Sequence, residues 1–212
     1  MTFRQWFVER KIPYEKAVAL SVGTDGVKLD KHALLSVSVT SPTMVGGDIG
    51  TMYVQGANPE AVIEFTGVQP AVYAANAAPV LEVRDRLAPV LAAADFVVVY
   101  ARGFMVPWLE TEFADLSGDC EFLDVIMMAK LVESNQILPS DCATVTAMAD
   151  RLMFSTNHIP KRGYSLDAVC ERIIPGISGD SADAFLTGDS PKLECQVYRL
   201  YALWQALLDM GN

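Results

Sequence analysis

Ala17–Val22 (AVALSV), followed at once by Gly23-Thr24-Asp25-Gly26, is the stretch that decides the fold. An apolar run that ends in a glycine-containing turn predicts a β-strand of a buried sheet. Two further β-rich runs follow, Ala33–Thr40 and Ile49–Gln55, and short turn-rich links separate the three. Runs of this kind joined by short links predict an antiparallel meander.

Beyond residue 56 the pattern changes to alternating helices and strands. Asn58, before Pro59 and Glu60, is a typical helix start. Apolar residues at three- and four-residue spacing predict a helix over Val80–Ala94, with Pro89 as a point where it kinks or splits. The continuously apolar run Asp95–Tyr100 predicts a strand buried on both faces. Further helices are predicted at Trp108–Phe113, Ser140–Met153, Ser165–Ile173 and Leu193–Met210, and Glu121–Val132 is predicted to hold a strand running into a helix.

This order of elements predicts an α/β layer fold of the ribonuclease H kind. Its central sheet is expected to be mixed, with the antiparallel meander first and parallel strands after it, flanked by helices. The chain of 212 residues is 51% apolar and 20% charged, which is a globular composition. No apolar run reaches the ~18–20 residues that a membrane-spanning helix needs. The N-terminus lacks a signal-peptide core, so we expect a cytoplasmic protein without membrane contact.

Charge and cysteine content exclude other classes. The net charge of −10 argues against tight, non-specific binding to a phosphate backbone, which needs clustered Lys and Arg. Small basic clusters such as Lys28 with Lys31 fit a solvated surface about as well as a nucleic-acid track. The four cysteines form no CxxC pair, and the chain has only two histidines, so a structural zinc site has the wrong spacing. Reduced, buried thiols are the expectation.

Several segments, in order, carry a resemblance to a known family. Thr66-Gly67-Val68-Gln69, Ala78-Pro79, the helix and strand over residues 80–100, Phe122–Val125 and Gly163–Cys170 occur near family spacing. In these features the chain resembles the DnaQ-like 3′–5′ exonucleases over roughly residues 17–208. The resemblance implies an exonuclease-like domain over 17–212, preceded by an N-terminal extension over 1–16.

The resemblance also implies where catalytic groups would lie. Family members hold two Mg²⁺ or Mn²⁺ ions with carboxylates, and those ions activate water for phosphodiester hydrolysis. The first motif is Asp-x-Glu on one face of the first strand, and here Ser21 and Gly23 fall on those positions. The second motif is a His-Asn pair with an aspartate shortly after it. Ala101 and Arg102 fall on the pair, and Val106 falls on the aspartate.

The third motif of the family holds a histidine base and a last aspartate about five residues on. Asp189 or Ser190 falls on the base position, and Glu194 or Cys195 on the last aspartate, in two registers that stay open. Three of four carboxylates and the base are therefore replaced, which predicts no catalytic residue, no bound metal and no other cofactor. Asp25 is expected to bond backbone groups in a turn rather than to rescue a metal site.

Three functions follow from this comparison. The first is a catalytically inactive exonuclease-like protein that acts as a binding or accessory factor through protein partners in replication, repair or RNA processing. The second is an active 3′–5′ exonuclease that uses non-standard ligands with Mg²⁺ or Mn²⁺. The third is a protein that binds single-stranded nucleic acid in its former catalytic cleft without cutting it. The lining of this cleft would be Thr24, Asp25, Arg102, Met105 and Trp108; the opposing interpretation is that Met105 and Trp108, with Phe104, are core residues of a short helix. A mean hydropathy of +0.26 is also compatible with a homodimer.

Overall fold

The computed structural model describes residues 17–40, 50–56, 58–113, 116, 120–134, 166–173 and 206. The N-terminal extension and the predicted helix Ser140–Met153 lie outside these residues, as does the predicted helix Leu193–Met210 apart from residue 206. The third-motif positions Asp189, Ser190, Glu194 and Cys195 lie outside them as well.

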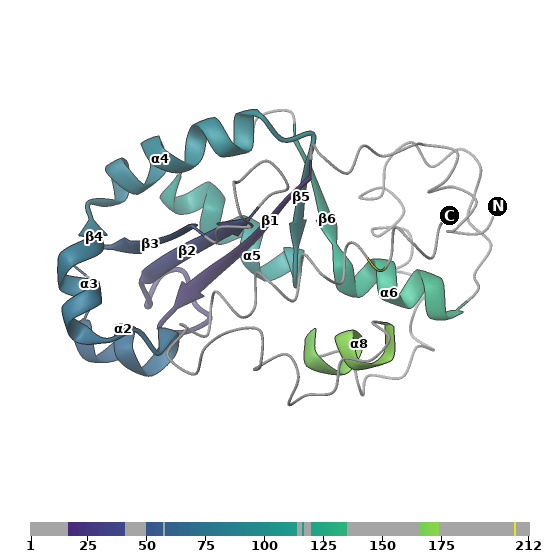
Figure 1. Cartoon of the computed structure of the whole chain (residues 1–212), viewed down its shortest axis with the longest axis horizontal. Helices are drawn as coiled ribbons and strands as arrows, with labels where there is room; N and C mark the ends of the chain where they lie inside the picture. The colour runs from purple at the N-terminus through teal and green to yellow at the C-terminus, as the bar shows by residue number, and fades with distance from the viewer. Residues whose placement is uncertain are drawn as a thin grey trace.

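A mixed sheet forms the centre of the described chain (Figure 1). Its strand order is β4-β3-β2-β1-β5-β6. β1 pairs antiparallel with β2, and β2 with β3, whereas β5 joins β1 in parallel and β6 joins β5 in parallel. The predicted meander followed by parallel strands is therefore confirmed. The strands are β1 (Ala17–Thr24), β2 (Leu34–Thr40), β3 (Gly50–Val54), β4 (Ala77–Ala78), β5 (Phe96–Val99) and β6 (Glu121–Asp124).

Helices follow the strands and cover both faces of the sheet. The prediction of a helix beginning after Asn58 is confirmed, and the Glu60 N–H donates to Asn58 Oδ1 at 3.0 Å. Pro89 lies inside α4 without splitting it. In the described part of the chain, no helix has the length and apolar content to cross a membrane. The helices are α2 (Pro59–Thr66), α3 (Pro70–Asn76), α4 (Val80–Ala92), α5 (Arg102–Glu112), α6 (Val125–Ser134) and α8 (Leu166–Ile173).

One predicted helix differs from the structure in its start. The sequence pattern places it at Trp108–Phe113, whereas α5 begins at Arg102. Pro107 has no backbone N–H and is unfavourable inside a helix, so the sequence pattern does not predict the helical turn that precedes it. α5 follows β5 through only two residues, and it includes the positions that the resemblance assigns to the second motif.

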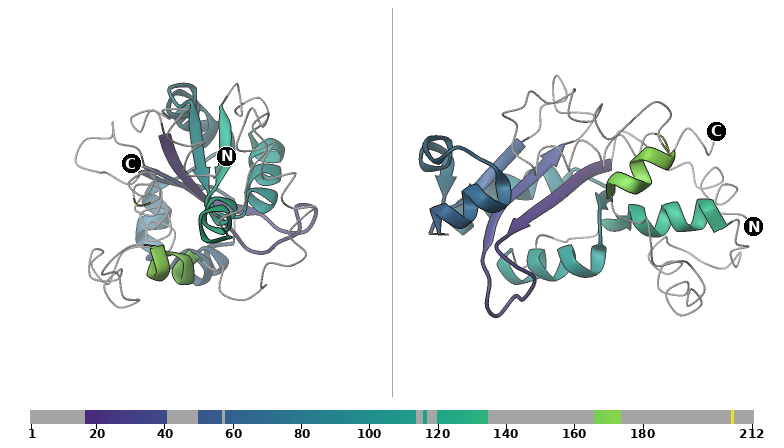
Figure 2. Two further views of the ribbon diagram at one scale, coloured as in Figure 1. Left: turned by 90° about the vertical axis from the view of Figure 1, so that its right-hand side faces the viewer. Right: turned by 90° about the horizontal axis from the view of Figure 1, so that it is seen from below.

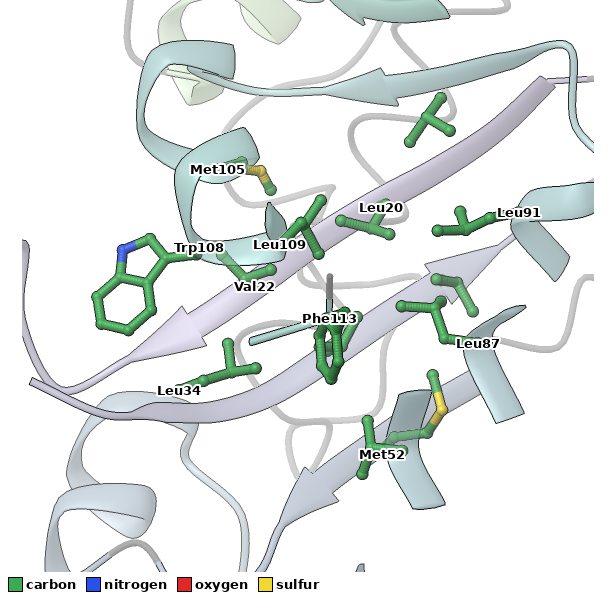
Figure 3. Close-up of a cluster of buried hydrophobic side chains, with 14 of the residues drawn as sticks. Leu20, Val22, Leu34, Met52, Leu87, Leu91, Met105, Trp108, Leu109 and Phe113 are labelled. Atoms are coloured by element: carbon green, nitrogen blue, oxygen red, sulfur yellow. The ribbon is translucent and has the colours of Figure 1, made fainter. Parts of the chain in front are cut away.

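The main core lies between one face of the sheet and helices α4 and α5 (Figure 3). Leu20 and Val22 of β1 pack there with Leu87 and Leu91 of α4 and with Trp108 of α5. A smaller cluster on Leu35, Tyr53, Val62, Val68 and Tyr73 joins the sheet to α2 and α3. A β-bulge at Gly23/Thr24 shifts the alternation of β2, so that Leu34, and not Leu35, shares the main core with Val37 and Val39.

Two of the four thiols belong to the described residues. Cys170 is buried beside Val169 in α8, and Cys120 is half-buried before β6. The expected burial of the thiols therefore holds for Cys170.

Candidate functional site

The carboxyl ends of the parallel strands β1, β5 and β6 lie together along one edge of the sheet. Open α/β folds bind their ligands at such carboxyl ends. Ala17 of β1 pairs with Phe96 of β5, which pairs with Glu121 of β6. Since β1 is the longest of the three, Ser21 and Gly23 lie beyond the level at which β5 ends. This edge is the candidate site.

Ser21 and Gly23 share one face of β1, as two positions two residues apart on a strand must. Val18, Leu20 and Val22 alternate with them and face the main core. Ser21 is buried and pairs across the sheet with Ser38, whose Oγ lies 2.8 Å from Thr51 Oγ1. This part of the sheet therefore presents small and hydroxyl-bearing residues in place of carboxylates.

Val106, Met105 and Trp108 all lie on α5. Val106 is half-buried against the main core. Met105 and Trp108 are only 3% and 1% exposed, and Figure 3 shows both side chains projecting from α5 among the residues of the main core. The interpretation of these two residues as cleft lining is therefore wrong, because the early start of α5 turns them onto the sheet. The opposing interpretation as core residues is confirmed. Phe104 packs edge-on against Trp108, with ring centroids 6.4 Å apart.

Asp25 and Thr24 hold the turn after β1. The Ala33 N–H donates to Asp25 Oδ1 at 2.6 Å, and Thr24 Oγ1 donates to the Gly26 carbonyl at 2.7 Å. The backbone role expected of Asp25 is confirmed. This bond gives the Asp25 carboxylate a structural role in the turn.

Asp124 is a buried acid at this edge to which the sequence had assigned no role. It ends β6, and its Oδ2 accepts from the Arg102 N–H at 2.9 Å. Its Oδ1 accepts from the Ile126 N–H at 2.9 Å, as an N-cap of α6 does. One side chain thus joins the ends of β6, α5 and α6. An aspartate between an apolar strand and a helical run was the signal that could have revealed it.

Burial raises the pKa of Asp124 above its ordinary value of 3.8. The backbone N–H groups of Arg102, Ile126 and Met127, and the charge of Lys130, oppose this effect without cancelling it. Between the ordinary pKa and the raised folded pKa, the native state binds more protons than the unfolded state. The contribution of Asp124 to stability is therefore complete below the ordinary pKa and is lost as pH rises through the folded pKa.

In wild type, the free energy of unfolding is expected to fall as pH rises, beginning near the ordinary pKa of Asp124 and ending above its raised pKa. The Asp124→Asn variant is expected to lack this fall. Urea titrations of both proteins at several pH values between about 4 and 7 measure this difference. Curves that stay parallel across the whole range would contradict the assignment. Asp85→Asn, at an exposed site on α4, is the matched control and is expected to leave the wild-type curve unchanged.

The junction between β5 and α5 contains a strained residue. Ala101, the residue before α5, has φ 58° and ψ 63° and is the one non-glycine residue with positive φ in the part of the chain described. A β-carbon in this left-handed conformation costs on the order of 1 kcal/mol.

Ala101→Gly is consequently expected to raise the free energy of unfolding by up to about 1 kcal/mol, less the entropy that glycine adds to the unfolded chain. Thermal and urea unfolding test this. The control is Ala93→Gly at the end of α4, where φ is −84°, and it should give no gain. A loss of stability for Ala101→Gly as large as that of the control would show that no strain is stored at Ala101.

The described residues offer a poor set of donors for paired dications. Within residues 17–40, 50–56, 58–113 and the shorter described segments, no three His, Cys, Asp or Glu side chains gather as metal ligands. Ser21, Gly23 and Val106 provide no anion, and Mg²⁺ requires oxygen donors with compensating charge. The cation Arg102, half-buried at the start of α5, adds positive charge to the same edge. These positions do not fit a two-metal centre.

Comparisons with solved structures agree with the ribonuclease H-like fold. A zinc-bound complex of E. coli exonuclease I with single-stranded DNA shares 13% identity at a TM-score of 0.55, over 89% of this chain and 39% of that one. A second structure of exonuclease I gives a TM-score of 0.52 at 13% identity, over 91% and 42%. A complex named exonuclease I/SSB-Ct gives 0.51 at 13% identity, over 91% and 42%.

The chain spans about two fifths of the length of these exonuclease I chains. No model of a protein family matches it, and no curated protein matches it. The shared fold is that of an exonuclease of the ribonuclease H-like class, and at 13% identity the likeness shows the fold alone.

Proposed function

We propose that this chain is a catalytically inactive exonuclease-like protein, which acts as an accessory factor in nucleic-acid metabolism through protein partners. The observation that carries the proposal is the absence of a carboxylate at Ser21, Gly23 and Val106 in a described fold of the exonuclease kind. Ser21 lies buried among hydroxyl-bearing neighbours, and Val106 packs on the core. Fold and chemistry are separable, because function depends on the site.

The two acids near this edge are engaged elsewhere. Asp25 bonds the Ala33 N–H across the turn, and Asp124 bonds the starts of α5 and α6. Both carboxylates therefore have structural roles in the described chain. Any backbone bond that metal coordination displaced would cost up to about 1–3 kcal/mol.

The alternative is an active 3′–5′ exonuclease with non-standard ligands. The observation in its favour is the likeness to exonuclease I, whose solved complexes include one with zinc and single-stranded DNA. This alternative needs Glu194 and at least one further acid outside the described residues. We favour the inactive form because three positions on β1 and α5 lack an anionic group.

Protein partners fit the charge of the chain better than nucleic acid does. A net charge of −10 opposes long-range attraction to phosphate. Exonuclease I itself was solved in a complex named for SSB-Ct, which supports a partner-binding role on this fold. We further propose a cytoplasmic location and leave a homodimer as one form of partner.

Titration calorimetry with Mn²⁺ tests the proposal. Wild type is expected to show no heat of tight binding, because too few anionic donors compensate two dications. Ser21→Asp/Gly23→Glu/Val106→Asp rebuilds the family's acids and, once shown to be folded by circular dichroism, is the positive comparison. A control adds the same charge at exposed positions by Val27→Asp/Val72→Asp/Leu81→Asp. Tight binding of Mn²⁺ by wild type would contradict the proposal.

A further inference from the structure

The link between β1 and β2 carries an exposed apolar and basic tip. We define the tip as residues 27–31, all of which are exposed. Val27 is 74% exposed and Leu29 38% exposed. Lys28 and Lys31 lie beside them, and Asp30 is the one acid of the tip, so its net charge is +1 in a chain of −10. Figure 2 shows this link projecting from the body of the molecule.

The tip is held rigid by hydrogen bonds beneath it. The Lys28 carbonyl accepts from the N–H groups of Lys31 at 3.1 Å and His32 at 3.0 Å. The Lys28 N–H lies 3.1 Å from His32 Nδ1. At the base, Asp25 bonds the backbone of Ala33 in both directions. The backbone groups of Lys28 and Asp25 are thus bonded within the link, and the side chains of Val27 and Leu29 are exposed.

The His32 ring makes this arrangement dependent on Gly26. A β-carbon at Gly26 would fall within 2.3 to 2.6 Å of three ring atoms, so any other residue would displace the ring. The bonds at Lys28 and between Asp25 and Ala33 set the path of the backbone beneath the tip. A loop that is ordered before it binds loses less entropy on binding, which raises its affinity for a partner.

We propose that this tip is a docking site for a short acidic segment of a protein partner that also carries apolar side chains. The inference rests on the proposed function and names the partner's chemistry. Val27 and Leu29 supply apolar area that is removed from water on contact. Lys28 and Lys31 attract and orient carboxylates, while the net charge of −10 on the whole chain repels poorly matched anionic partners.

Nucleic acid matches this surface less well. The tip has no arginine and no aromatic side chain. Single-stranded nucleic acid is bound by basic grooves that follow the backbone and by aromatic rings that stack on bases. A net charge of +1 releases few counterions, so little affinity for a polyanion comes from it.

Selection from a random peptide library displayed on phage tests the proposal, with the full chain immobilised. Enriched peptides are expected to combine Asp or Glu with Leu, Ile, Val or Phe. The binding of synthetic copies is then measured by fluorescence anisotropy. Val27→Ser/Leu29→Ser is expected to weaken it about tenfold, whereas Val72→Ser/Leu81→Ser, at exposed apolar sites on α3 and α4, should leave it unchanged.

Charge reversal provides the second arm. Lys28→Glu/Lys31→Glu is expected to weaken peptide binding at least about tenfold at low salt, and less at high salt. Arg86→Glu, on the exposed face of α4, is the control. A labelled oligothymidylate is titrated in parallel and should bind weakly, with no dependence on the tip.

The proposal is overturned if enriched peptides lack acidic residues or bind the tip variants as well as wild type. It is also overturned if only the oligothymidylate depends on the tip. Peptides that bind elsewhere would leave the accessory function standing while removing this site. Nuclease activity in wild type would remove the proposed function without touching the peptide result.

Discussion

Trp108→Ala is expected to lower the free energy of unfolding by about 3–5 kcal/mol. The indole is 1% exposed and lies between α5 and β1, with Met105 and Leu109 from its own helix beside it (Figure 3). Truncation removes apolar area from the core and leaves a cavity that the sheet can close only in part. Because α5 begins next to the candidate site, the same change should loosen the strand edge.

Urea unfolding followed by circular dichroism measures this loss. Leu81→Ala, at a side chain 60% exposed on α4, is the matched control and is expected to change stability by less than about 0.5 kcal/mol. A Trp108→Ala variant that differs from the control by less than about 1 kcal/mol would show that the indole is not a core residue. It would also reopen the interpretation of Trp108 as a stacking surface.

Asp124→Ala is expected to cost about 2–4 kcal/mol at neutral pH. The change removes the acceptor of the Arg102 and Ile126 N–H groups, each bonded at 2.9 Å. Leaving buried donors unsatisfied costs about 1–3 kcal/mol each, and part of that cost is offset because a desolvated carboxyl group disappears. The ends of β6, α5 and α6 lose their common partner.

Chemical denaturation again measures the loss, and Asp124→Asn separates its causes. Asn keeps one acceptor oxygen, so its cost should fall between those of wild type and Asp124→Ala. Asp85→Ala, on the exposed face of α4, is the control and should be near neutral. If Asp124→Ala were as stable as this control, the junction would not depend on the carboxylate.

Much of the fold could be predicted from periodicity. The strand alternation of Leu35–Val39 and the apolar run after Asp95 identified strands because burial fixes one or both of their faces. The start of α5 could not be predicted, since Pro107 masks the first turn and the left-handed Ala101 leaves no side-chain cap as a signal. The short β4 and helix α3 were missed because two strand residues and seven helical residues carry too little pattern.

The site was predicted only in part. Ser21 and Gly23 were expected to share one face of β1, because side chains two residues apart on a strand point to the same side. The burial of Met105 and Trp108 depends on how α5 is rotated about its own axis. The sequence pattern did not determine that rotation. Asp124 was noted only as part of the resemblance over Phe122–Val125, and its bond to the start of α5 was missed because Arg102 lies far away in sequence. The residues of the third motif stay predictions.

The most direct test of the central claim is an exonuclease assay on a 3′-labelled single-stranded oligonucleotide, with excess protein and either Mg²⁺ or Mn²⁺. The account predicts that the oligonucleotide stays at full length, because the strand edge lacks the anions that two dications need. Metal-dependent shortening from the 3′ end that disappears in Glu194→Gln would contradict it and would establish an active enzyme.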